Sequence, residues 1–331
     1  ASLKKITNNP NATYYPSAEL VIINKDGQIE NKLKLSYKFN ITAHKPFSQQ
    51  AVYVDVINGN IIWKENKLHE QDTTGTANTL YSGQQQITCS DHLGNYRLEE
   101  TGRGNGIYTY AFEMAGPLPS HVDITNHSPN WNHCHLDSIN TNASRGALDL
   151  HWGIEVIYDY FLNVHGRNSI DGFGKQLTSI AHYDPYGSGW SNAAFSLLYD
   201  VMMFGDSYSQ DDPWTALNVV AHEATHGLTK YSANLSYWAE SGALNESFSD
   251  IFGATIDFIT RPNQANWLIG EEITGTAFRN MADPRAVSHA NTYFGTFWAD
   301  TAGWDMGGVH SNSSIQNLWY VLLTEGGSGT N

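Results

Sequence analysis

The five residues His222-Glu223-Ala224-Thr225-His226 combine side chains that bind metals with one that can move protons. They lie in a run with apolar residues at helical spacing, which predicts a helix over residues 216–231. In a helix the two histidines lie one turn apart on one face, where both imidazoles can bind the same zinc ion. Glu223 lies beside them and can polarise a water on the metal. For this pattern alone, the alternative is a helix that merely exposes two histidines.

A second helix, expected over residues 244–259, adds two carboxylates one turn apart, Glu246 and Asp250. Catalytic zinc takes three protein ligands and keeps one open position, so Glu246 is the candidate third ligand. Asp250 is placed to accept the spare N–H of a ligand histidine. The alternative is a solvated helix face. Against it, Leu244 and Phe248 make the helix substantially apolar, and inward carboxylates then need partners.

A third element, residues 305–311, carries one histidine next to a pair of glycines. Gly307 and Gly308 allow a sharp backbone turn that brings His310 near a substrate. Asp305 can orient or charge that imidazole. Taken alone, the element is equally consistent with an ordinary glycine-rich loop.

Together these runs resemble the thermolysin family of zinc metalloendopeptidases. The similarity covers about residues 75–331, and the first segment resembles the end of the propeptide that this family carries. Nineteen residues separate His226 from Glu246, as in this family, whereas zinc aminopeptidases with the same histidine motif typically have eighteen. The matching runs are residues 222–227, 241–253, 278–284 and 305–311, with weaker matches at 103–107 and 149–160.

The resemblance implies a role for each residue of the reaction centre. His222, His226 and Glu246 would bind one zinc ion, and Glu223 would be the general base that activates the attacking water and passes its proton to the leaving amine. Tyr237 and His310 would donate hydrogen bonds to the oxyanion of the attacked carbonyl. The supporting residues implied are Asp305 beside His310, and Asp250 and Asn245 beside the zinc-bound imidazoles.

The resemblance also implies a peptide-binding strand. Asn192 and the backbone of Ala193 would hold an extended peptide as an added strand, and Arg279 would hold a substrate carbonyl. Val219 and Phe278 fall at pocket-lining positions, consistent with cleavage before bulky apolar residues. The strand motif is irregular here, since about two extra residues precede the run Phe204-Gly205-Asp206.

Calcium sites of the family look eroded in this chain. Asn218, Asn266 and Leu268 stand where carboxylates are expected, while Asp257 and Glu271 remain. Calcium favours several oxygen ligands with net negative charge. We therefore expect at most one weak Ca²⁺ site on Asp257 and Glu271, or none.

The expected fold class is α+β, with a β-rich pro-segment over residues 1–72, a β-rich N-terminal lobe over 73–210, and a zinc helix with a helical lobe over 211–331. The family continues past the last residues of this chain, so we expect a truncated helical lobe. Residues 1–70 hold nine Lys and Arg against six Asp and Glu, and residues 71–331 hold nine against 27. With the polar, breaker-rich stretch 71–76, this shift suggests a boundary where a protease can enter.

Partners and location follow from charge, hydropathy and the resemblance. A net charge of −15 disfavours nucleic acid, and no apolar run approaches the ~18 residues of a membrane span. The expected partners are protein or peptide substrates and the chain's own pro-segment, in a secreted protein. Cys89 and Cys134 would form one disulfide after export, or remain two unpaired thiols. The functional alternative to a protease zymogen is a catalytically silent relative, kept as an inhibited precursor or a binding protein.

Overall fold

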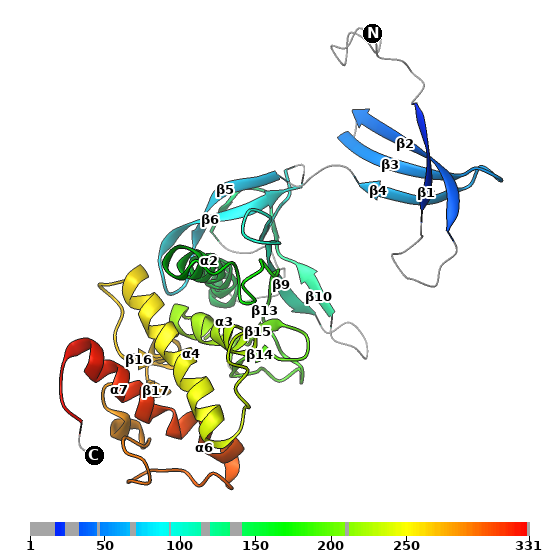
Figure 1. Ribbon diagram of the computed structural model, residues 1–331. Coiled ribbons are helices and arrows are strands. Elements are labelled where there is room, and N and C mark those ends of the chain that lie inside the picture. The colour runs from blue at the N-terminus through cyan, green and yellow to red at the C-terminus, as the bar shows by residue number, and fades with distance from the viewer. Residues whose placement is uncertain are drawn as a thin grey trace. The chain divides into compact units, whose positions relative to one another are not determined.

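The computed structural model describes residues 17–23, 33–44, 47–66, 71–92, 94–113, 120–132, 141–208 and 212–329. The chain divides into two compact units, Ala1–Glu70 and Gln71–Asn331, which are each described by themselves. Figure 1 shows the first unit as a sheet and the second as strands followed by helices.

The first unit is a four-stranded antiparallel sheet in the order β1-β2-β3-β4. Its strands are β1 (Ala18–Ile23), β2 (Lys34–His44), β3 (Phe47–Asp55) and β4 (Ile61–Asn66). Asn58-Gly59 forms a hairpin turn, because β3 pairs with β4 across it and Gly59 adopts a φ of 74°.

The second unit begins with two sheets. One is ordered β11-β7-β6-β5-β12, and the other β10-β9-β13-β15-β14 with β8 paired to β9. Their strands are β5 (Gln71–Asn78), β6 (Gln84–Asp91), β7 (Tyr96–Arg97), β8 (Glu99–Glu100), β9 (Ile107–Glu113), β10 (Ser120–Asp123), β11 (Thr125–Asn126), β12 (Asn130–Trp131), β13 (Leu177–Ala181), β14 (Ala193–Ser196) and β15 (Val201–Phe204).

Helices dominate the rest of the second unit (Figure 1). They are α2 (Thr141–His165), α3 (Leu217–Lys230), α4 (Ala239–Thr260), α5 (Glu271–Thr274), η2 (Pro284–Val287), α6 (Trp304–Asn312) and α7 (Ser314–Glu325), with β16 (Leu268–Ile269) paired to β17 (Arg279–Asn280). The mixed sheets and helices agree with the α+β class expected from the sequence. None of the described helices combines the length and apolar content of a membrane span.

The local structure of two segments differs from what composition or periodicity indicated. The polar, breaker-rich stretch 71–76 is a strand, because it lies within β5 and pairs with β6 along its whole length. The division into two units falls just ahead of it, between Glu70 and Gln71. The threonines of this stretch suit a strand, and Gly75 allows close approach of another backbone, since a Cβ there would lie 1.9 Å from the Pro129 oxygen. Helix α4 begins five residues earlier than the range 244–259 expected from its apolar periodicity.

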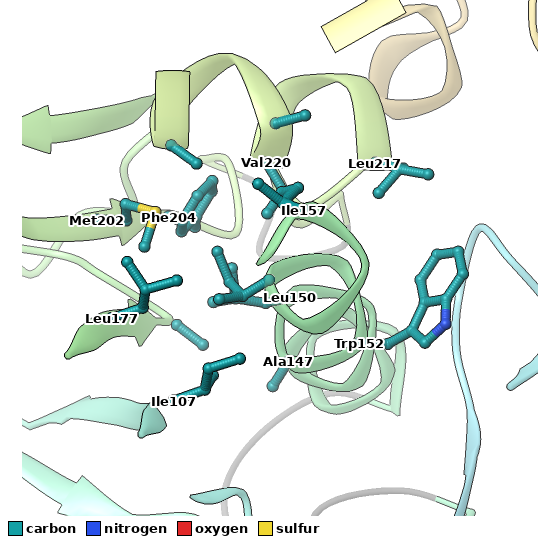
Figure 2. Packing of buried hydrophobic residues seen from close by; sticks show 14 of the residues in the cluster. Ile107, Ala147, Leu150, Trp152, Ile157, Leu177, Met202, Phe204, Leu217 and Val220 are labelled. Carbon is teal, nitrogen blue, oxygen red and sulfur yellow. The ribbon is translucent and has the colours of Figure 1, made fainter. Parts of the chain in front are cut away.

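The main hydrophobic core forms between helix α2, helix α3 and the β9-β13-β15 sheet. Leu150 and Ile157 of α2 face Leu177 and Phe204 of the sheet (Figure 2). Val220 of α3 packs into the same cluster, so the helix that carries the histidine motif is held by its apolar face. Cys89 is buried in this core. Cys134 lies outside the described residues, so the expectation of a Cys89–Cys134 disulfide stays a prediction.

Candidate active site

His222 and His226 of α3 face Glu246 of α4, and all three side chains are buried. The two Nε2 atoms lie 3.1 Å apart, and they lie 3.4 and 3.3 Å from the two carboxylate oxygens of Glu246. The three ligand atoms lie within 4.8 Å of one another, which fits one small cation. Glu246 Oε2 is buried without a hydrogen-bond partner among the described residues, as expected for an oxygen that a metal would satisfy. Two imidazoles and a carboxylate are a zinc donor set.

A glycine sets the distance between the two ligand helices. A Cβ at Gly253 of α4 would lie 2.6 Å from the carbonyl oxygen of Asn218 on α3. Because glycine lacks that atom, the helix backbones approach closely, and Glu246 of α4 reaches the histidines of α3.

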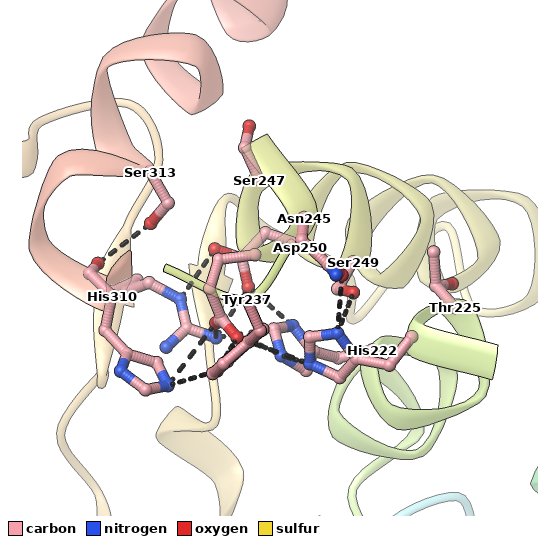
Figure 3. Close-up of polar contacts among 12 residues, drawn as sticks. His222, Thr225, Tyr237, Asn245, Ser247, Ser249, Asp250, His310 and Ser313 are labelled. Carbon is pink, nitrogen blue, oxygen red and sulfur yellow. Dashed lines mark hydrogen bonds and ion pairs between the residues drawn. The ribbon is translucent and has the colours of Figure 1, made fainter. Parts of the chain in front are cut away.

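The other ring nitrogens of both histidines are held by hydrogen bonds. His222 Nδ1 donates to Asp250 Oδ1 at 2.9 Å, and His226 Nδ1 donates to Asn245 Oδ1 at 2.8 Å. Ser249 Oγ lies 3.2 Å from the same His226 nitrogen, a partner that the sequence analysis missed. These bonds leave each Nε2 free for a metal and fix the orientation of each ring (Figure 3).

Charges in this buried cluster balance one another. Burial opposes ionisation of Glu246, yet the imidazoles of His222 and His226 hold the pKa of this carboxyl well below its usual range. Burial likewise opposes charge on His222, but the carboxylates of Glu246 and Asp250 outweigh it and raise its pKa to about 10. Arg279 Nε donates to Asp250 Oδ2 at 2.6 Å and Nη2 to Oδ1 at 2.7 Å. Despite burial, Arg279 and His222 lower the pKa of Asp250 to about 2.

Tyr237 lies between the ligand cluster and His310 (Figure 3). The Tyr237 hydroxyl donates to Glu246 Oε1 and lies 3.3 Å from His310 Nε2. His310 Nδ1 is 2.5 Å from Asp305 Oδ1, and the side chain of His310 is 46% exposed. The expected support of His310 by Asp305 is therefore present as a contact.

A left-handed turn positions His310. Asp305, Met306, Gly307 and Gly308 all have positive φ, so the segment expected as a glycine-rich loop is a left-handed turn that leads into the helical end of α6. A Cβ at Gly307 would lie 2.4 Å from the Thr301 oxygen, which requires glycine there.

A cavity of about 500 Å³ joins these parts. Glu223 lines it together with the zinc-ligand candidates, and strand β14 forms one wall. Every expected substrate-binding residue lines this cavity: Asn192, Ala193, Val219, Phe278 and Arg279. The lining residues that the sequence analysis missed are Ala194, Phe195, Leu197, Trp214, Ile269 and Met306.

Trp214 illustrates why some residues that line the cavity could not be predicted from the sequence. Its ring stacks on Phe278, with centroids 4.6 Å apart and planes inclined by 9°. Trp214 lies in a segment without helix or strand, ahead of α3, where no periodic pattern indicates burial. Its partner is 64 residues away in the chain, so only the tertiary structure brings the two rings together.

The two residues expected to hold calcium, Asp257 and Glu271, belong to no set of three candidate metal ligands among the described residues, although Glu271 Oε2 is buried without a hydrogen-bond partner there. Asp257 accepts hydrogen bonds from Arg261 Nε and Nη2 at 2.7 and 2.9 Å, so a guanidinium already balances its charge. Glu271 accepts a hydrogen bond from Asn266 at 2.8 Å. Among the described residues, the group His222, His226 and Glu246 is the one set of three that could hold a metal ion.

Comparisons with known proteins agree with this geometry. The family described as "Thermolysin metallopeptidase, catalytic domain" matches residues 74–230, and its "alpha-helical domain" matches residues 233–331. A thermolysin from Bacillus sp. (strain EA1) is 33% identical over 330 residues, covering 93% of this chain and 56% of that protein. A bacillolysin from Bacillus caldolyticus is 34% identical over 322 residues, covering 90% of this chain and 55% of that protein.

Among solved structures, the precursor of protealysin, a metalloproteinase from Serratia proteamaculans, is similar with a TM-score of 0.48 and 28% identity, covering 66% of this chain and 67% of that one. The chain spans a little over half the length of the curated relatives it matches. The family matches cover most of the sequence, and the chain belongs to the thermolysin family of metallopeptidases.

Proposed function

We propose that this protein is a zinc endopeptidase that hydrolyses internal peptide bonds. The observation that carries the proposal is a buried His222, His226 and Glu246 cluster that opens, with Glu223, into a cavity walled by a β-strand. When bound there, zinc would act as a Lewis acid toward water and the substrate carbonyl.

The chain's own groups would then complete the reaction. Glu223 takes a proton from the attacking water and delivers it to the leaving nitrogen, since its carboxylate lines the same cavity. Tyr237 and His310 donate hydrogen bonds to the oxyanion, a role supported by their 3.3 Å approach at the rim of the ligand cluster. Asp305 holds the His310 ring through Nδ1, which leaves Nε2 facing the cavity.

The substrate would bind as an extended strand. In the described sheet β14 stands at one end, paired to β15 alone, and its residues line the cavity. A peptide can therefore extend the sheet there, with Asn192 and the Ala193 backbone as its partners and Arg279 near a substrate carbonyl. Val219, Phe278 and Trp214 supply an apolar wall that favours a bulky apolar residue after the scissile bond.

Residues 1–72 would act as a pro-segment that keeps the peptidase latent, with lobes over 73–210 and 211–331. Leu20 pairs with Tyr37 and Ile22 with Leu35, so these four exposed apolar side chains share one face of the first sheet. Such a face is typical of a docking surface. Because β5 begins at Gln71, cleavage is best sought just ahead of it, near Glu70. We also propose that the protein acts outside the cell.

The main test is cleavage of a peptide blocked at both ends, with and without a zinc chelator. Glu223→Gln should still bind one zinc ion per chain, because Glu223 is not a ligand. Its turnover rate should be about 10²–10⁴-fold lower than that of the wild type. A variant that kept more than about a tenth of the wild-type rate would exclude Glu223 as the base.

A second experiment follows the N-terminal sequence of the intact chain against activity. Activity that appears only as the first unit is removed supports latency, whereas full activity with Ala1 attached excludes it. A chain that binds zinc yet cleaves nothing after removal of the first unit would favour the alternative, a catalytically silent binding protein.

A further inference from the structure

The carboxylate of Asp250 receives four hydrogen bonds at the back of the zinc-ligand cluster. Oδ1 accepts from His222 Nδ1 at 2.9 Å and from Arg279 Nη2 at 2.7 Å. Oδ2 accepts from Arg279 Nε at 2.6 Å and from Asn317 Nδ2 at 2.7 Å. A carboxylate offers about four lone-pair positions, so the set is complete only when Asn317 contributes.

Asn317 reaches this site from helix α7, 67 residues along the chain from Asp250. Its side chain is fully buried, and its Oδ1 accepts a hydrogen bond from the Ser247 hydroxyl at 2.7 Å. Because an ionised carboxylate only accepts hydrogen bonds, the amide nitrogen is the end that points toward Asp250, and the Ser247 hydroxyl, which can donate or accept, adapts to it. Two hydrogen bonds from Arg279 and one from Asn317 thus fix the plane of the Asp250 carboxylate, and this carboxylate in turn orients the His222 ring.

We infer that Asn317 is a positioning residue of the zinc site, which acts on His222 through Asp250. The inference rests on the proposed zinc function and adds a dependence of that site on the last described helix. Without the amide, Asp250 Oδ2 keeps one donor, and the carboxylate can turn about its Cβ–Cγ bond and tilt the imidazole. Partners of metal ligands contribute about 10–100-fold to metal affinity, and a residue one step further out should act at the lower end.

The test measures zinc affinity of the full 331-residue chain, stripped with a chelator and titrated against a coloured zinc indicator. Asn317→Leu preserves side-chain size and removes both polar ends, and we expect about tenfold weaker zinc binding. The control is Ser247→Ala, which removes the second partner of Asn317 and leaves the Asp250 contact in place; its zinc affinity should be unchanged. Asn317→Ser serves as a second variant, because its smaller polar side chain places no apolar group against Asp250 and Ser247.

The chain loaded with Co²⁺ supplies a readout that a general loss of stability does not move. The visible absorption of Co²⁺ reports ligand geometry, so it should change in both Asn317 variants and stay constant in Ser247→Ala. Equal zinc affinity and an unchanged spectrum in folded Asn317 variants would overturn the inference and leave the proposed function standing. Equal loss in Ser247→Ala would also overturn it, since general packing would then explain the effect. A wild-type chain that binds no zinc would overturn both.

Discussion

Arg261, the residue that follows helix α4, forms a bidentate ion pair with Asp257 in the last turn of that helix, and both side chains are 4% exposed. The same guanidinium donates to Glu272 at 2.7 and 3.1 Å. It also lies 3.4 Å from Ser82 Oγ in the turn between β5 and β6. One cation thus joins the helical region to the strand region of the second unit.

Replacing Arg261 with alanine should cost about 3–5 kcal/mol in the free energy of unfolding, because Asp257 and Glu272 lose their shared cation in a buried setting. Urea unfolding measures the effect, and exposed Arg285→Ala is the matched control.

Millimolar Ca²⁺ should leave the melting temperature of the wild type unchanged. A large rise in melting temperature with Ca²⁺ would restore the calcium site expected from the sequence.

Gly308→Ala should disturb the turn that presents His310. A Cβ there would lie 2.4 Å from the Ala299 Cβ, at a φ of +79°. We expect about 10²-fold lower kcat from the displaced imidazole, together with a stability loss of about 1–3 kcal/mol. Gly326→Ala is the control, because its φ is +81° but nothing lies within 4 Å of the added atom. Equal activity in the two variants would contradict a role for the turn in placing His310.

His151 should make the protein sensitive to acid. It is fully buried, its Nε2 donates to the Thr88 oxygen at 2.8 Å, and its Nδ1 accepts from Thr109 Oγ1 at 2.9 Å. Burial lowers its pKa to about 4, so the folded protein keeps the ring neutral while the unfolded chain protonates it below about 6.5. The stability contributed by this ring is present above pH 6.5 and is lost as the pH falls toward 4.

Between pH 7 and 4.5 this loss amounts to about 2 kcal/mol. Urea unfolding at both pH values should show a smaller loss in His151→Gln than in the wild type. Exposed His127→Gln should behave like the wild type. An identical pH dependence in all three proteins would show that His151 does not control the acid response.

The turn between β14 and β15 should contribute to substrate selection. Leu197 lines the cavity, while its neighbour Leu198 is 78% exposed and does not. Lys230 of the zinc helix donates to the Leu197 oxygen and to Asp200, both at 2.6 Å, so the turn is held in place. We expect Leu197→Ser to lower kcat/KM about tenfold for peptides rich in apolar residues, and Leu198→Ser to have little effect. Equal kcat/KM values would remove Leu197 from the binding site.

Local chemistry could be predicted from the sequence wherever spacing along one helix decides it. The histidines of α3 and the carboxylates of α4 repeat every four residues, so the period of the helix alone places them on one face. Ser249, Trp214 and Arg261 could not be assigned in this way, because their contacts depend on how separate elements pack. The strand at residues 71–76 could not be predicted, because polar and breaker residues there suggested only a boundary between segments, whereas pairing with β6 decides their conformation.

The position of β14 at the end of its sheet has a consequence for the substrates that the proposed peptidase could cut. Under the proposed function, a substrate must offer several consecutive residues whose backbone groups are free to pair with β14. Residues inside helices and sheets of a folded protein have already committed those groups to their own neighbours. The rate of cleavage would then depend on how often a segment of the target protein unfolds locally. Stable proteins would resist cleavage under conditions in which unstable proteins of the same composition are degraded.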